Sequence, residues 1–227
     1  AAGYRALCHG QKTYNGVAIL SRSEHGAPEA VVAGMGDGDP DSEARLLAAT
    51  IPGLGVRVLS AYIPNGQVVG SDKYSYKLAW LARLRRYLDT RCDPQTPLLL
   101  CGDYNVAPDD RDVYDPPGWA DTVICHPEVR AGFQRLLDFG LSDTLRLRNQ
   151  QAGLYTYWDY RQLAFPKNQG LRIDHILCTA PLIAAPRRRR SRRRSSAPPR
   201  PYSLLSIIFG SVGPIPSIHP VKGGCLS

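Results

Sequence analysis

The hydrophobic pattern of the first 180 residues consists of short apolar runs separated by turns rich in Gly, Pro and Asn. Apolar runs of four to eight residues bounded by such turns are typical of buried strands. The segment 21–42, rich in Gly, Asp and Pro, is expected to be a connection, and 154–160 a strand or an aromatic-walled loop. The runs predicted to be strands are 17–20, 46–51, 56–63, 97–102 and 170–178.

Two stretches show helical spacing instead. Ser71 is a plausible N-cap for a helix over 72–90, along which leucines recur every three or four residues. A second helix is expected before Gly140, with an apolar face that includes Val129 and Phe133. A helix between two strands, the second of them buried, is the α/β pattern.

The run 97–102 ends at Gly102, and Asp103 and Asn105 follow it. Residues two apart in extended chain point the same way, so these two side chains are expected to lie together. A carboxylate and an amide at the carboxyl end of a buried strand suit a hard cation and a phosphate. An ordinary turn at a strand end would use the same residues.

Three further residues could carry chemistry, each with a structural alternative. Tyr62 closes a strand, either as a site residue or as a half-buried aromatic side chain. Asp174 lies in a strand between apolar residues and needs a partner, which could be a structural arginine. Trp158 could stack on a base or fill the core. His175 alternates with Asp174 and is expected to be a structural histidine that faces the other way.

The net charge of +8 is distributed unevenly over the 227 residues. Residues 183–227 hold nine basic residues and no acidic one, so the remainder is close to neutral. This basic, Pro- and Ser-rich tail is expected to be disordered and attracted to nucleic acid, or to be the product of a frame-shift. The six cysteines lack metal-site spacing and predict reduced thiols in a cytoplasmic protein. The apolar runs are all too short to predict a membrane span.

Several motifs occur in one order along the chain, and this order resembles the exodeoxyribonuclease III family of apurinic/apyrimidinic endonucleases, within the endonuclease/exonuclease/phosphatase fold. The resemblance runs from about Tyr4 to Leu182. The motifs are His-Gly-Gln-Lys-Thr-Tyr-Asn-Gly from residue 9, Ala-Tyr-Ile-Pro-Asn-Gly from 61, Lys-Leu-Ala-Trp from 77, Leu-Cys-Gly-Asp-Tyr-Asn from 100, Leu-Ser-Asp-Thr-Leu-Arg from 141, Tyr-Trp-Asp-Tyr-Arg from 157 and Gly-Leu-Arg-Ile-Asp-His-Ile-Leu from 170.

The resemblance implies a four-layer α/β sandwich, in which two packed mixed β-sheets are flanked by helices. It implies hydrolysis of DNA phosphodiesters with Mg²⁺ or Mn²⁺, by a monomer acting on double-stranded DNA at abasic sites or 3′ ends. Domain 1–182 would be the nuclease, without the family's first strands, and 183–227 would be the tail.

The resemblance also implies residue roles. Asp103 would orient or deprotonate the attacking water, Asn105 would be the amide of the phosphate and metal site, and Tyr62 would place its phenol beside the scissile phosphate. Asp174 would orient a catalytic histidine. A further set is expected to contact nucleic acid and consists of Lys77, Trp158 and Arg172. Of these, Trp158 would form a wall of the pocket for the abasic sugar.

The chain departs from the family pattern at both ends. The family's Asn-bearing first strand, its metal-binding Glu and its Ser-Asp-His-x-Pro motif have no counterpart here, and His219 has no Asp before it. The chain as given is therefore expected to be catalytically inactive. The alternatives are a non-catalytic nucleic-acid-binding protein, and a phosphatase or phosphodiesterase of the same fold.

Overall fold

The computed structural model describes residues 3–38, 43–160 and 163–185. The strands are β1 Tyr4–Gly10, β2 Gly16–Arg22, β3 Glu29–Ala33, β4 Leu46–Ile51, β5 Val56–Tyr62, β6 Leu98–Asp103, β7 Leu141–Asp143, β8 Tyr157–Trp158, β9 Gly170–Leu171 and β10 Asp174–Thr179. The α-helices are α1 Asp72–Arg91, α2 Pro116–Trp119, α3 Pro127–Leu137 and α4 Ala180–Ala184, and short 3-10 turns cover Ser23–His25 and Asp110–Asp112.

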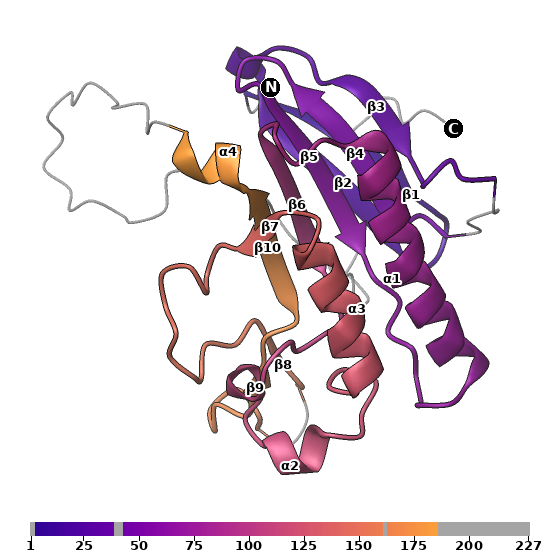
Figure 1. Ribbon diagram of the computed structural model, residues 1–227, viewed down its shortest axis with the longest axis vertical. Helices are drawn as coiled ribbons and strands as arrows, with labels where there is room; N and C mark the ends of the chain where they lie inside the picture. The colour runs from indigo at the N-terminus through magenta and orange to yellow at the C-terminus, as the bar shows by residue number, and fades with distance from the viewer. Residues whose placement is uncertain (1–2, 39–42, 161–162, 186–227) are drawn as a thin grey trace, which may run out of the picture.

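A six-stranded mixed sheet forms the centre, in the order β3-β4-β5-β6-β10-β7 (Figure 1). β5 and β6 are parallel, because helix α1 carries the chain back across the sheet between them, and the other neighbours are antiparallel. The last strand, β10, lies between β6 and β7. This order places β10, which lies near the end of the described chain, directly beside β6, the strand that ends at Asp103.

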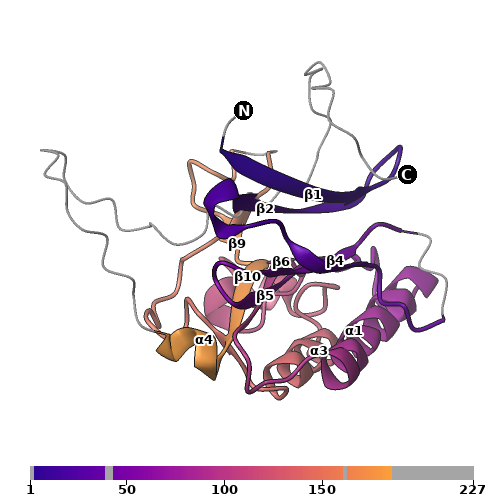
Figure 2. The same ribbon diagram turned by 90° about the horizontal axis from the view of Figure 1, so that it is seen from above.

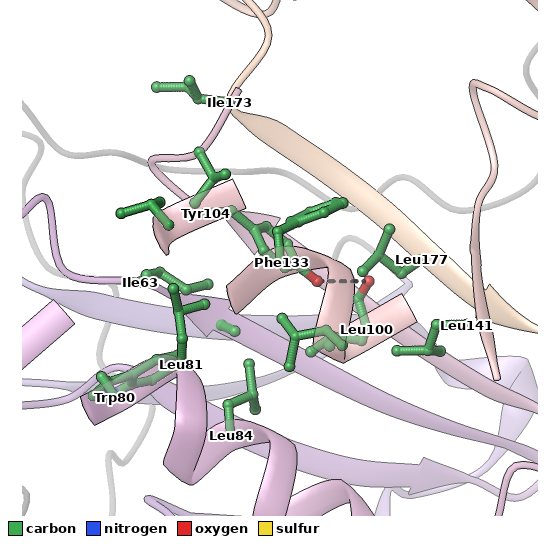
Figure 3. Close-up of a cluster of buried hydrophobic side chains, with 14 of the residues drawn as sticks. Ile63, Trp80, Leu81, Leu84, Leu100, Tyr104, Phe133, Leu141, Ile173 and Leu177 are labelled. Carbon is green, nitrogen blue, oxygen red and sulfur yellow. Dashed lines mark hydrogen bonds between the residues drawn. The ribbon is translucent and has the colours of Figure 1, made fainter. Parts of the chain in front are cut away.

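The central sheet is covered on both faces. The β1–β2 hairpin lies over one face, and helices α1 and α3 lie over the other (Figure 2). Side chains alternate across the sheet, so the core is divided into two clusters. Leu100 and Leu177 belong to the helix-side cluster with Trp80 and Phe133 (Figure 3), whereas Leu99 belongs to the hairpin-side cluster. The predicted α/β sandwich is confirmed, and the described residues supply three of its four expected layers.

Helix α1 begins and packs as its sequence predicts. The Ser71 hydroxyl accepts a hydrogen bond from the amide of Tyr74, which satisfies one free N–H of the first turn. The buried leucines face the sheet and α3. At Gly132 of α3, an added Cβ would lie 2.9 Å from Leu81 Cδ1, so a glycine allows the two helices to approach closely.

Several details differ from the expected pattern. Strands β1 and β7 were not among the predicted runs. The connection 21–42 contains strand β3, which pairs with β4. The run 170–178 is broken into β9 and β10, because the side chain of Arg172 turns into the interior between them. Only residues 157–158 of the aromatic segment form a strand. The predicted tail, from residue 186 on, lies outside the described residues. Within the described part of the chain, no helix is long and apolar enough to cross a membrane.

Candidate active site

Tyr62, Asp103 and Asp174 form a row across three adjacent strands. Tyr62 of β5 pairs with Asp103 of the parallel β6, and Asp103 pairs with Asp174 of the antiparallel β10. Partners that are opposite each other in a sheet share a face, and by alternation this is the face of Leu99 and Cys101, towards the hairpin. The structure therefore brings together three residues, of which the outer two, Tyr62 and Asp174, are more than 110 positions apart in sequence.

Gly102 permits this close arrangement. It has a φ of +150°, and a Cβ at this position would lie 1.7 Å from the carbonyl oxygen of Ala61 on β5. Only glycine can occupy a backbone position with such a neighbour. The contact sets how closely the Tyr62 and Asp103 ends of the two strands approach.

Asn105 reaches the site through a turn and not through strand alternation, which corrects the reason given for its position. β6 ends at Asp103, and Asn105 has a φ of +49°, a left-handed conformation that asparagine tolerates well. The backbone N–H of Asn105 donates a hydrogen bond of 2.8 Å to Asp103 Oδ1. The predicted pair of Asp103 and Asn105 is thus held together by a local side-chain-to-backbone bond.

The two carboxyls of the row have perturbed protonation. Burial, and next the negative charge of Asp174, raise the pKa of Asp103 to about 7. Burial also raises the pKa of Asp174, and the hydroxyl of Thr156 opposes this shift. The alternative in which Asp174 pairs with an arginine is wrong for the part of the chain described, where this carboxylate forms no ion pair. A carboxyl with a pKa near neutrality can accept a proton at physiological pH.

The side chain of Asn105 is buried and hydrogen-bonded on both sides. Its Nδ2 donates to the Ile63 carbonyl oxygen at 3.0 Å, and its Oδ1 accepts from Asn65 Nδ2 at 3.1 Å. Asn65 itself is exposed, and its sequence context marked it only as part of a turn. This asparagine is a site residue that the sequence pattern did not reveal, and Asn105 supports it from beneath.

Lys77 does not lie at the surface, so the expectation that it contacts nucleic acid is corrected. The residue is fully buried, and its Nζ donates to the carbonyl oxygens of Asn65, Asn105 and Val123 at 3.1, 2.6 and 2.6 Å. Burial lowers its pKa to about 7. Lys77 therefore joins the three loops behind the site.

Arg172 is also internal, which corrects its predicted contact with DNA. It is 2% exposed, and its guanidinium forms two hydrogen bonds with Asp112, at 2.7 and 3.0 Å, and one with Asp143, at 2.8 Å. A buried guanidinium needs such carboxylate partners. The pairs fix the turn that separates β9 from β10 and so set where β10 begins.

His175 is the structural histidine that the alternation predicted. Its Nε2 donates to the Val106 carbonyl oxygen at 2.8 Å, and its Nδ1 accepts from Arg172 Nη1 at 2.9 Å. Burial, and next the charge of Arg172, lower its pKa to about 4, so the ring is neutral. It holds the loop after Asp103 against β10 from the helix side of the sheet.

The ring of Trp158 packs inside its own loop. It forms edge contacts with Phe165 and Tyr155, at centroid distances of 5.2 and 6.3 Å, and its Nε1 donates to Asn168 Oδ1 at 3.4 Å. The adjacent Tyr157 is 40% exposed and lies on the opposite face of β8. In this structure Trp158 supports the loop, and its predicted contact with an abasic sugar stays a prediction.

The donor set suits a hard cation. Asp103, Asp174 and Asn105 offer oxygen atoms, and two like-charged carboxyls with raised pKa values would be relieved by a positive ion. Within the ranges that the structure describes, no group of three or more His, Cys, Asp or Glu side chains could hold a metal. Mg²⁺, which often takes only one or two carboxylates and keeps its waters, fits this set best.

Comparison with known proteins gives one consistent result. The model of the Endonuclease/Exonuclease/phosphatase family matches residues 1–196. Exodeoxyribonuclease III of Haemophilus influenzae is 36% identical, with 79% of this chain and 70% of that protein covered. The DNA repair nuclease APEX1 of Danio rerio is 35% identical, and the match covers 79% of this chain but 56% of that protein. The chain thus spans little more than half of one relative and 70% of the other.

Solved structures agree. An AP endonuclease from Archaeoglobus fulgidus superposes with a TM-score of 0.74 at 39% identity, over 79% of this chain and 68% of that one. A 3′-5′ exonuclease from Neisseria meningitidis gives 0.71 at 43% identity, over 78% and 67%. A 3′ phosphatase from Neisseria bound to a product DNA hairpin gives 0.72 at 42%, over the same shares. The chain belongs to the Endonuclease/Exonuclease/phosphatase family, among relatives that are exodeoxyribonucleases and AP endonucleases.

Proposed function

We propose that this chain carries the catalytic face of a Mg²⁺-dependent DNA phosphodiester hydrolase of exodeoxyribonuclease III type, which acts on duplex DNA at abasic sites and 3′ ends. The observation that carries the proposal is the row of Tyr62, Asp103 and Asp174, in which the pKa of Asp103 is about 7. Family membership supports the same chemistry.

In the proposed reaction, Asp103 accepts the proton of the attacking water. A base contributes most when its pKa is near the working pH, and typically about 10²–10⁴-fold in rate. Tyr62 places its phenol at the end of the neighbouring strand, where it can donate a hydrogen bond to a phosphate oxygen. Asn105 holds the exposed Asn65 through a hydrogen bond. The side-chain amide of Asn65 can also donate a hydrogen bond to a phosphate oxygen.

The metal, Mg²⁺ or Mn²⁺, would be held by Asp103 and Asn105 together with Asp174, and when bound it neutralises charge on the phosphate oxygens. With only two carboxylates in the described site, we propose that residues 1–227 alone bind the ion weakly and turn over slowly or not at all. Adding Mg²⁺ should lower the pKa of Asp103, which carboxylate ¹³C NMR can follow without any activity. An unchanged titration would contradict this assignment.

Two other functions are open to the same site. The Neisseria relative is a 3′ phosphatase, so release of a terminal phosphate is the second candidate, since the same groups would attack a monoester. The third is nucleic-acid binding without hydrolysis, in which backbone phosphates are held electrostatically. The monomeric state and the cytoplasmic location stay predictions.

One set of duplexes separates these functions. Strand scission at an abasic site or shortening from a 3′ end would support the nuclease, release of inorganic phosphate from a 3′-phosphate would support the phosphatase, and retention without product would support the binder. Asp103→Asn should lower any turnover by about 10²–10⁴-fold. The matched control is Asp93→Asn, because Asp93 is exposed in the turn before β6 and an asparagine can still accept from the amide of Gln95. Near-normal turnover by Asp103→Asn would refute the proposed mechanism.

A further inference from the structure

Arg45 lies immediately before β4 and beside Tyr62, at the end of the catalytic row. The Tyr62 amide donates to the Arg45 carbonyl oxygen at 2.8 Å, and Arg45 Nη1 donates to the Tyr62 carbonyl oxygen at 3.2 Å. The guanidinium carbon lies 4.7 Å from the centroid of the Tyr62 ring. One backbone hydrogen bond, one side-chain-to-backbone hydrogen bond and one cation–π contact thus connect the same pair of residues.

Glu43 holds this guanidinium in place. Its Oε2 accepts from Arg45 Nε at 2.6 Å, and the two side chains are 31% and 10% exposed. Burial opposes the charge of Glu43, but the hydrogen bond and charge of Arg45 keep the pKa of that carboxyl below its usual value. A mostly buried arginine with one carboxylate and one carbonyl partner has little freedom to move.

Arg45 also acts electrostatically on the row. Its positive charge lowers the pKa of Asp103 against the larger effects of burial and Asp174. Burial, and next the charge of Asp103, raise the pKa of Tyr62, while Arg45 lowers it and Glu43 raises it. The charged groups that act on the phenol therefore come from the segment before β4 and from β6, and Arg45 is the positive one among them.

We propose that Arg45 is a positioning residue of this site, which fixes the orientation of the Tyr62 phenol and supplies a permanent positive charge beside the row. The proposal deepens the nuclease function proposed above and rests on it for its catalytic meaning. A phosphodiester brings negative charge to a row that already holds two carboxyls, so a fixed cation favours the approach of the substrate. The planar guanidinium does this without the conformational freedom of a lysine.

The test uses ¹³C-Cζ-tyrosine and carboxyl-¹³C labelling of the whole chain, followed by NMR titration, with Tyr62→Phe and Asp103→Asn to assign the signals. Arg45→Gln should raise the pKa of Tyr62, because the positive charge 4.7 Å from the centre of its ring is lost, and should shift the Tyr62 ring signals. Arg45→Lys should return the pKa of Tyr62 towards its original value and leave its ring signals shifted. The control is Arg57→Gln, because Arg57 likewise donates to a carbonyl, that of Ala30, at the far end of β5.

If Arg45→Gln does not fold, Glu43→Gln carries the test, because it frees the guanidinium without removing it and should shift the Tyr62 ring signals. An unchanged titration and unchanged ring signals of Tyr62 in folded Arg45→Gln or Glu43→Gln would overturn the proposal. The same proteins are assayed on the abasic duplex. Absence of cleavage by the unchanged chain, together with an Asp103 titration that Mg²⁺ does not change, would refute the nuclease function and leave the NMR result on Arg45 intact. Where cleavage occurs, Arg45→Gln should lower kcat at least tenfold and move its pH profile upwards, and an unchanged profile would also overturn the proposal.

Discussion

Asp103 and Asp174 are opposite each other on antiparallel strands, with both carboxyls on the same face of the sheet. Neither forms an ion pair with any residue that the structure describes. Like charges directly opposite in a sheet destabilise it, and here the repulsion is reduced because the Asp103 carboxyl, with a pKa of about 7, is about half protonated at pH 7. The site thus stores an unfavourable interaction that a proton or a cation relieves.

This relationship predicts a pH-dependent stability. The pKa of Asp103 is higher in the folded protein, about 7, than in the unfolded chain, so the folded state binds more protons between about pH 4 and 7. Its contribution to stability is complete at low pH and is lost as the pH rises through 7, at no more than about 1.4 kcal/mol per unit. Asp103→Asn should therefore be more stable than the unchanged chain at pH 8 and equally stable near pH 4.

Urea unfolding at pH 5 to 8 measures this difference. Comparison of the two proteins at each pH cancels the opposite contribution of His175, whose lowered pKa makes stability rise with pH between about 4 and 6.5. Parallel stability curves for Asp103→Asn and the unchanged chain would contradict the raised pKa of Asp103.

The buried ion pairs of Asp112 predict that removal of one negative charge strongly lowers the free energy of unfolding. Asp112 is fully buried between Arg172 and Arg146, and Asp112→Asn would leave two buried guanidinium groups short of a charged partner. We expect a loss of about 3–5 kcal/mol in the free energy of unfolding. Asp110→Asn is the control, because its pair with Arg130 is 70% exposed on the Asp110 side and should contribute about 0–1 kcal/mol. Equal losses in the two variants would show that burial of the Asp112 pairs does not matter.

Because Lys77 is buried, replacing it should loosen the loops behind the site and should not remove a contact with DNA. Lys77→Met keeps an unbranched side chain one atom shorter but leaves the carbonyl oxygens of Asn65, Asn105 and Val123 without their donor. Each such loss costs about 1–3 kcal/mol, partly offset because the buried charge is also removed, so we expect a net destabilisation of about 2 kcal/mol. Amide exchange should accelerate around Asn105. Lys73→Met, on the exposed side of α1, should neither destabilise the protein nor accelerate this exchange. Equal effects of the two variants would show that Lys77 does not hold these loops.

Gly102 predicts the most severe phenotype. In Gly102→Ala the new Cβ meets the backbone of Ala61 at 1.7 Å, and backbone cannot move aside as a flexible side chain can. We expect separation of β5 from β6 and loss of cooperative unfolding by circular dichroism. Gly10→Ala, whose Cβ would have no heavy atom within 4 Å, should behave like the unchanged protein. A cooperatively folded Gly102→Ala would argue against this close contact between strands.

The sequence pattern predicts elements well where local signals agree. The hairpin of β4 and β5, the capped helix α1 and the buried β6 all follow from apolar spacing and turn residues. Strand β3 was missed because its apolar run is short and Gly-rich segments surround it. The row of Tyr62 and Asp103 could be anticipated, since both residues close strands that a helix connects.

Buried charges are what the pattern could not place. Lys77 and Arg172 are of residue types that usually lie at the surface. Carbonyl oxygens 28 and 46 positions from Lys77, and a carboxylate 60 positions from Arg172, hold these two side chains inside. Arg45 and Asn65 carry no local mark either, because their roles depend on Tyr62 and Asn105. Such partnerships form only across the folded sheet.

The position of β10 between β6 and β7 has a consequence for synthesis. A ribosome makes Tyr62 first, Asp103 about forty residues later and Asp174 about seventy residues after that. Until β10 emerges, β6 has an open edge and the row lacks its third member. Nascent chains that end before about residue 180 therefore expose a hydrogen-bonding edge without a site, and this stage of translation is one at which chaperone protection would matter.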